Sequence, residues 1–132
     1  MKRIQNMIPD AIQACHEILL DNGRKTAIDR EFNGYISSFG ASVISAGLLP
    51  SIIFYSQKGD SATDRPKIIL CIQNILRKHG YSNLNLLDKV RTLFTGNTNQ
   101  AEISLLTDKI FDAAIALKLA IRTFPKSKKE QL

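Results

Sequence analysis

The stretch EFNGYISSFGASVISAGLLPSIIFYSQK, residues 31–58, is the part of the chain that decides the predicted fold. Between Phe32 and Gln57 it contains no charged side chain, although charged residues make up 23% of the whole sequence. Its first half has apolar residues at alternating spacings of four and three, which is typical of a helix with one buried face. These residues are Phe32, Ile36, Phe39, Val43 and Ala46. We therefore expect a core-facing helix here and place it at the centre of the fold.

A second face of the same predicted helix contains only small residues. They are Gly34, Ser38, Ala41 and Ser45. Small side chains allow another backbone to approach closely, either from within the domain or from a neighbouring subunit. Packing within the domain is the more common use of such a face, and a subunit contact is the alternative.

A tight corner is expected after this helix. Gly47 stands where a helix ends on a left-handed residue, and Pro50 stands where a new helix tolerates the loss of a backbone N–H. The second helix, 50–57, is apolar nearly all round at 52–55, so we expect it to be interior. The whole stretch contains too many serines, and Pro50, to be a membrane span. A DNA-recognition helix is excluded because such a helix presents polar and basic side chains.

The rest of the chain predicts an all-α fold of about six helices in one compact bundle without a sheet. The other helices are expected from about Ile4 or Pro9 to Asp21, and at 65–79, 85–94 and 100–124, because each has an apolar stripe of helical period. Asp29 is placed to cap the central helix. We expect a single domain, 1–132, with halves 1–58 and 65–124, a polar connector 59–64 and a basic tail 125–132.

Charge and cysteine content indicate a cytoplasmic protein. Lys and Arg number 18 against 12 Asp and Glu, a net charge of +6 that is compatible with a polyanionic partner. Cys15 and Cys71 each fall in an apolar stripe, so we expect both thiols to be free and buried. The N-terminus has no continuous apolar segment of the kind that a secretory signal contains.

The sequence contains no recognisable catalytic or metal-binding pattern. His16 and His79 lack ligand partners at the spacing that metal sites use, and Cys15 and His16 point about 100° apart on a helix. Asp108 and Asp112 are one turn apart, and we expect them to be solvated surface acids. We therefore expect a protein that is not an enzyme, with no metal, no cofactor and no small-molecule substrate.

Particular residues carry a family resemblance. In the central stretch they are Tyr35, Phe39, Ile44, Gly47-Leu48-Leu49 and Phe54-Tyr55-Ser56-Gln57-Lys58. In the last helix they are Thr107, Asp108, Lys109, Ala116-Leu117-Lys118 and Arg122-Thr123-Phe124. With these motifs the chain resembles the small all-helical subunit of the type III-B CRISPR Cmr complex. Ala46 departs from the Asn expected before the corner glycine.

The resemblance implies a non-catalytic subunit of an antiviral ribonucleoprotein, stacked head to tail with copies of itself beside other Cmr subunits, guide RNA and target RNA. A repeated basic surface would hold the RNA backbone without reading bases. Candidate RNA-binding residues are Lys118, Arg122, Arg24, Lys25, Arg30, Lys67 and Lys126. The small face would then be the candidate subunit contact.

Two other functions are weighed against this one. A stand-alone helical adaptor for protein partners comes second, and an enzyme with an unrecognised site comes last. Basic residues that converge on one face would favour RNA binding, whereas a broad uncharged exposed patch would favour the adaptor. A deep polar pocket would favour the enzyme.

Overall fold

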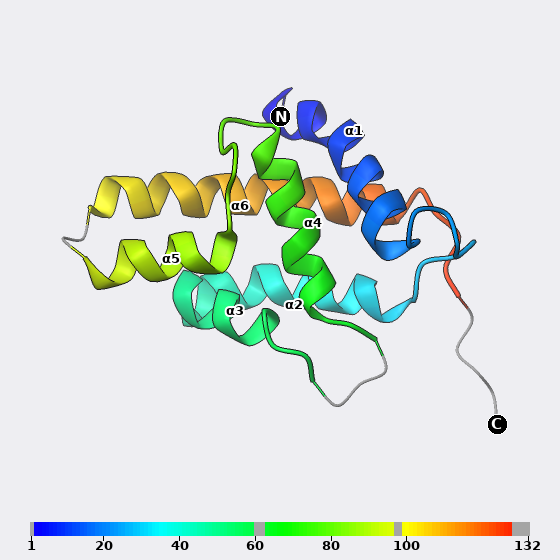
Figure 1. The fold of residues 1–132 in the computed structure, drawn as a ribbon, viewed down its shortest axis with the longest axis horizontal. Coiled ribbons are helices and arrows are strands. Elements are labelled where there is room, and N and C mark those ends of the chain that lie inside the picture. Colours follow the sequence, from blue (N-terminus) through cyan, green and yellow to red (C-terminus); the bar gives the residue numbers. More distant parts are fainter. Residues whose placement is uncertain (1, 60–62, 97–98, 128–132) are drawn as a thin grey trace.

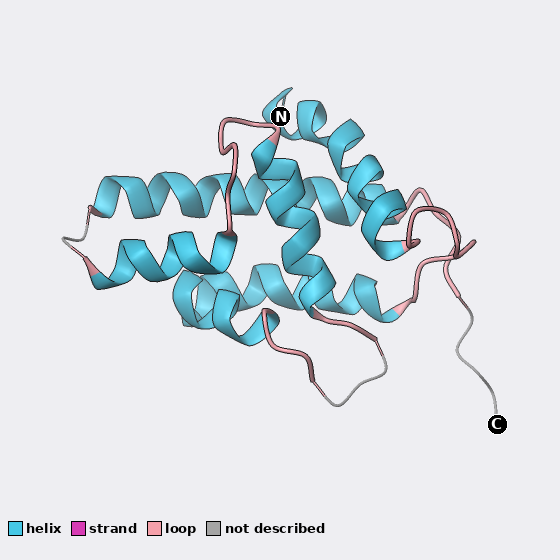
Figure 2. Ribbon diagram, viewed as in Figure 1, coloured by secondary structure: helices cyan, strands magenta, loops and turns pink. Residues whose placement is uncertain are grey.

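Helices make up 71% of the structure. The computed structural model describes residues 2–59, 63–96 and 99–127, and these ranges contain α-helices and a short π-helical turn but no strand (Figure 2). The elements are α1 (Lys2–Ala14), η1 (Cys15–Leu19), α2 (Glu31–Ala46), α3 (Leu48–Tyr55), α4 (Pro66–Arg77), α5 (Leu86–Thr95) and α6 (Gln100–Ile121). The predicted all-α class with six helices is confirmed. The expected connector 59–64 and tail 125–132 lie partly outside the described residues.

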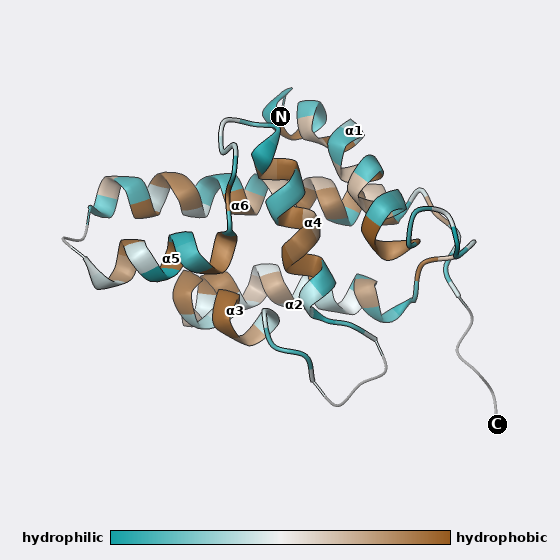
Figure 3. Ribbon diagram, viewed as in Figure 1, coloured by the Kyte–Doolittle hydropathy of each residue, from teal (hydrophilic) through white to brown (hydrophobic). Residues whose placement is uncertain are grey.

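Helix α4 crosses in front of α6, near the middle of the long axis of the molecule (Figure 1). It packs against α1, η1, α2, α3 and α6. Much of α4 is hydrophobic (Figure 3), and Ile68, Ile72 and Ile75 are fully buried. The prediction that the uncharged stretch forms the centre is therefore wrong, because a helix is central only when it is covered on several sides.

Helices α2 and α3 form an outer layer with one buried face each. The predicted stripe of α2 is buried at Phe32, Ile36, Phe39 and Val43, but Ala46 is exposed. In α3, Ile52 and Tyr55 are buried as predicted, but Ile53 and Phe54 are 42% and 52% exposed, so the prediction that 52–55 is interior is wrong at these two positions. A continuous run of apolar residues covers every face of a helix, but only one face packs against the core.

The corner between α2 and α3 confirms the role expected of Gly47. Its φ is +98° and its ψ is 167°, a conformation that side chains disfavour. The Gly47 N–H donates to the Val43 carbonyl, and the Ser51 hydroxyl donates to the Gly47 carbonyl at 2.8 Å. The corner is therefore fixed by a glycine conformation and by hydrogen bonds on both sides of it.

The first helix widens into a π-helical turn before it ends. Three successive residues with positive φ, Asp21, Asn22 and Gly23, end the helix close to the predicted end at Asp21. Both thiols are free and buried beneath this region, as expected. Burial raises the pKa of Cys15 to about 12 and raises the pKa of Cys71 well above its ordinary value, so neither thiol is ionised at neutral pH.

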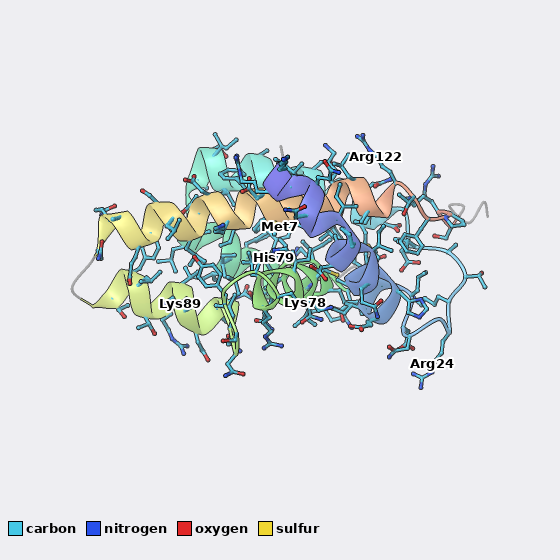
Figure 4. The ribbon with its side chains drawn as sticks, turned by 90° about the horizontal axis from the view of Figure 1, so that it is seen from above. Met7, Arg24, Lys78, His79, Lys89 and Arg122 are labelled. Carbon is cyan, nitrogen blue, oxygen red and sulfur yellow. The ribbon has the colours of Figure 1, made fainter. Side chains whose placement is uncertain are left out.

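The two ends of the chain meet through α1 and α6. Helix α1 crosses over the second half of α6 (Figures 1 and 4). Small buried residues line the crossing, among them Ala11, Ala113 and Ala116. None of the helices in the described ranges is both long enough and apolar enough to cross a membrane.

Candidate nucleic-acid and subunit surfaces

One end of the molecule collects most of the predicted RNA-binding residues. The Ile28 N–H donates to the Pro125 carbonyl, and the Ser127 N–H donates to the Ile28 carbonyl, each at 2.9 Å. These bonds form a short parallel bridge between Ile28 and Lys126. The bridge brings the loop before α2 to the segment after α6. The residues brought to this end are Arg24, Lys25, Arg30, Arg122 and Lys126.

This basic end is not a single converging surface. Arg24 and Arg122 lie at the same end of the molecule but point toward opposite sides of it (Figure 4). Arg24 also pairs with Asp21 at 3.3 Å, and Lys25 with Asp29 at 3.7 Å. Local carboxylates therefore neutralise part of the positive charge, which reduces what remains for a phosphate.

The prediction that Asp29 caps α2 is wrong. Arg30, not Asp29, stands at the N-cap, and it makes no side-chain capping bond. The Asp29 carboxylate instead pairs with Lys25, and its backbone carbonyl accepts from the Phe32 N–H at 3.1 Å.

The remaining two predicted cations belong to other parts of the bundle. Lys118 is half-buried one turn before Arg122 on α6, so the two share a helix face as expected. Lys67 is half-buried in the first turn of α4, which begins nearer the middle of the long axis (Figure 1). Among the described residues, neither lysine has a carboxylate within ion-pair distance.

The face of small residues on α2 points outward. Gly34, Ser38, Ala41 and Ser45 are all exposed, and a Cβ built on Gly34 would meet nothing within 4 Å. The more common alternative, packing within the domain, is therefore excluded. Ile44, on the same helix, is 77% exposed. Close approach to this face is available to a separate chain.

Asp112 is not the surface acid that the sequence indicated. It is only 6% exposed, and its Oδ2 accepts a hydrogen bond from Arg3 Nε at 2.6 Å. The crossing of α1 over α6 covers this carboxylate, which an i, i+4 pattern within one helix cannot reveal. Asp108, one turn earlier, is exposed as expected.

His79 has a carboxylate partner that the sequence did not suggest. Its Nε2 lies 2.7 Å from Oδ2 of Asp10 on α1, and Lys78 Nζ lies 3.8 Å from Oδ1 of the same carboxylate. The contact ties the end of α4 to α1. Within the described ranges, no group of three or more His, Cys, Asp or Glu side chains is arranged to hold a metal ion.

The motif at 54–58 is held by a cation from the next element. The Arg65 guanidinium stacks on the Phe54 ring at 4.0 Å from its centroid, and Nη2 donates to the Gln57 carbonyl at 2.8 Å. The half-exposed Phe54 ring is thus fixed by Arg65, and it also meets the Tyr55 ring edge to face at 5.2 Å between centroids.

Two half-buried lysines were missed by the sequence analysis. Lys89 on α5 and Lys109 on α6 have no ion-pair partner among the described residues. Nothing in their local sequence distinguishes them from solvated cations. The fold places both along one pocket, which residues of α5, α6 and the loop before α5 line.

A family model described as CRISPR-associated protein (Cas_Cmr5) matches residues 3–122 of the chain. The match runs from the first turn of α1 to the residue that follows α6. No curated protein and no solved structure gives a match.

Proposed function

The chain belongs to the Cas_Cmr5 family of CRISPR-associated proteins, the small-subunit family of type III-B Cmr complexes, and we propose that it is a non-catalytic, cytoplasmic subunit that stacks as a filament and supports guide RNA and target RNA. The observation that carries the proposal is the family match over residues 3–122. RNA cleavage would then belong to other subunits of the complex.

Two exposed surfaces support the stacking part of the proposal. A head-to-tail filament needs two different surfaces that fit each other, because one self-complementary patch would close into a dimer. The first surface is the small face of α2 with Ile44. The second is formed by Ile53 and Phe54 of α3 and Leu70 of α4, all more than 40% exposed. Apolar surface of this kind is available for burial between copies.

Cationic side chains without an ion-pair partner support the RNA-binding part of the proposal. Arg30, Lys67, Lys118 and Arg122 have no ion-pair partner among the described residues, although salt bridges engage Arg24 and Lys25. Lys126 Nζ donates to the Phe124 carbonyl and has no carboxylate partner among the described residues. Such groups hold phosphates without reading bases.

Reconstitution of the complex with and without this chain tests the proposal. We expect native mass spectrometry to show more than one copy in the assembled particle, and omission of the chain to weaken target-RNA binding. A purified particle that forms normally and never incorporates the chain would contradict the proposal. Stable capture of a non-Cmr protein instead would support the stand-alone adaptor.

The salt dependence of RNA binding gives a quantitative prediction for the isolated chain. If about three phosphates are neutralised, counterion release from a single strand gives a log–log slope near −2. Raising salt from roughly 50 to 200 mM should then weaken binding about twentyfold. Fluorescence anisotropy with labelled single-stranded RNA measures this slope, and a slope near zero would exclude an electrostatic interface.

A further inference from the structure

A depression lined by both polar and apolar residues lies between α5, the loop 78–85 and the first half of α6. It consists of two adjoining pockets of about 510 and 380 Å³ that share Gly80, Tyr81 and Lys89 in their linings. The larger pocket is lined mainly by polar side chains of the loop and of α5, including Ser82, Asn83 and Asn85. The smaller pocket is lined by leucines at positions 93, 105 and 106. Together they offer an apolar surface beside an amide-rich one.

The loop that separates the pockets is held in place by side-chain contacts with α4. Arg77 Nε donates to the Leu84 carbonyl at 2.9 Å, and Gln73 Oε1 accepts from the Leu86 N–H at 2.8 Å. Positive φ angles at Gly80 (+98°) and Asn83 (+60°) fix the turns at each end of the loop. The walls of the depression are therefore formed before any ligand arrives, which lowers the entropy cost of binding.

The charged side chains of the depression differ in whether they already have an ion-pair partner. Lys89 and Lys109 line it and lack ion-pair partners among the described residues, whereas Asp88 is bonded by Arg91 Nη2 at 2.5 Å. Glu102 is the acid that lines the smaller pocket. Its carboxylate and burial both raise the pKa of Tyr81, burial more strongly, so the phenol stays protonated and able to donate. The space beside Glu102 suits a neutral group better than a second anion.

These features match the parts of a single-stranded nucleotide. An aromatic ring and leucines provide a surface on which a base can stack, and two lysines provide contacts for its flanking phosphates. Amide and hydroxyl groups of the larger pocket can bond base edges and 2′-hydroxyls. An acidic peptide would use the lysines and the polar wall, but it has no planar base to place against Tyr81 and the leucines. Lys78, His79 and Lys89 lie along the same side of the molecule, away from the basic end at Arg24 (Figure 4).

We propose that this depression binds single-stranded RNA, with one base against Tyr81 and the backbone at Lys89 and Lys109. The inference rests on the proposed function and relocates its main RNA contact from the end of α6 to the α5–α6 depression. Lys118 and Arg122 are then secondary phosphate contacts. Duplex RNA, whose bases are already stacked and paired, should compete weakly.

Charge reversal tests the site in the full chain with a twelve-nucleotide single-stranded RNA. We expect Lys89→Glu and Lys109→Glu each to weaken binding about fivefold, and the double variant at least tenfold, because each removes one phosphate contact. Lys58→Glu is the matched control, since Lys58 is exposed, unpaired among the described residues and outside the depression. Its effect should stay below twofold. Circular dichroism confirms that each variant is folded, and Lys→Gln versions repeat the test without an added negative charge.

Photo-crosslinking tests the site without altering the protein. RNA that contains 5-iodouridine should crosslink to Tyr81, and Tyr81→Leu should abolish that crosslink and weaken binding at least fivefold. Crosslinks at the end of α6 only, with Tyr81→Leu and the lysine variants unchanged, would overturn the location while leaving the proposed function intact. Equal competition by polyglutamate of matched charge would overturn the nucleotide site. Absence of any RNA binding by the unaltered chain at low salt would overturn both the site and the RNA-binding part of the proposed function.

Discussion

Replacing Phe39 by Ala is expected to lower the free energy of unfolding by about 3–5 kcal/mol. The Phe39 side chain is fully buried on α2, and its ring meets the Tyr55 ring edge to face at 5.3 Å between centroids. Truncation removes this contact and leaves a cavity between α2 and α3 that neighbouring helices fill only in part. For a domain of this size the midpoint of thermal unfolding should fall by roughly 10–20 °C.

Ile44→Ala on the same helix is the matched control for the Phe39 prediction. It also truncates a large apolar side chain, but Ile44 is 77% exposed, so the change should stay within about 0.5 kcal/mol. Urea unfolding followed by circular dichroism measures both variants at one low protein concentration. Similar losses for the two would mean that Phe39 is not a core residue.

Replacing Gly47 by Ala is expected to destabilise the fold by about 2 kcal/mol. Space is not the reason, because a Cβ at Gly47 would meet Pro50 Cδ at 3.8 Å, an ordinary contact. The cost comes from the backbone, which holds φ at +98° and ψ at 167° in a region that residues with a side chain avoid. Relaxing the angles would change the direction of α3 and break the hydrogen bonds of the corner.

Gly40→Ala distinguishes this backbone effect from a general effect of glycine removal. Gly40 lies in the interior of α2, and a Cβ built there meets nothing within 4 Å. Alanine should therefore stabilise the helix by about 0.5–1 kcal/mol, a change of opposite sign. Chemical denaturation resolves the two signs, and destabilisation by both substitutions would argue against the strained corner.

Local signals allowed the elements of this fold to be predicted, but not their arrangement. The stripe at Phe32, Ile36 and Phe39, and the stop at Gly47, depend on neighbours within a turn, so the sequence reveals them. Which helix lies in the middle depends on how many others pack against it. Uncharged serines and glycines in α2 are compatible with solvent, whereas the isoleucines of α4 are not. A lack of charged residues therefore does not show that a helix lies at the centre of the fold.

The candidate surfaces were harder to predict, because they depend on contacts between distant parts of the chain. The sequence does not show that Arg3 reaches Asp112 or that Asp10 reaches His79. It also does not show which cations have an ion-pair partner, as Arg24 does, and which have none among the described residues, as Lys89. The resemblance at 54–58 was more informative, since a family motif carries information about an assembly that spacing lacks.

The crossing of α1 over α6 has a consequence for synthesis on the ribosome. Helix α1 emerges first, and its buried face packs against α6, which emerges last. The Arg3–Asp112 hydrogen bond joins residues near the two ends of the chain. Fixing such remote partners is slow, because most of the chain must be ordered to bring them together. Until α6 has left the exit tunnel, α1 keeps apolar surface uncovered and exposed to chaperones. We therefore expect nascent chains truncated before α6 to be sensitive to protease, and resistance to appear only when the final helix is released.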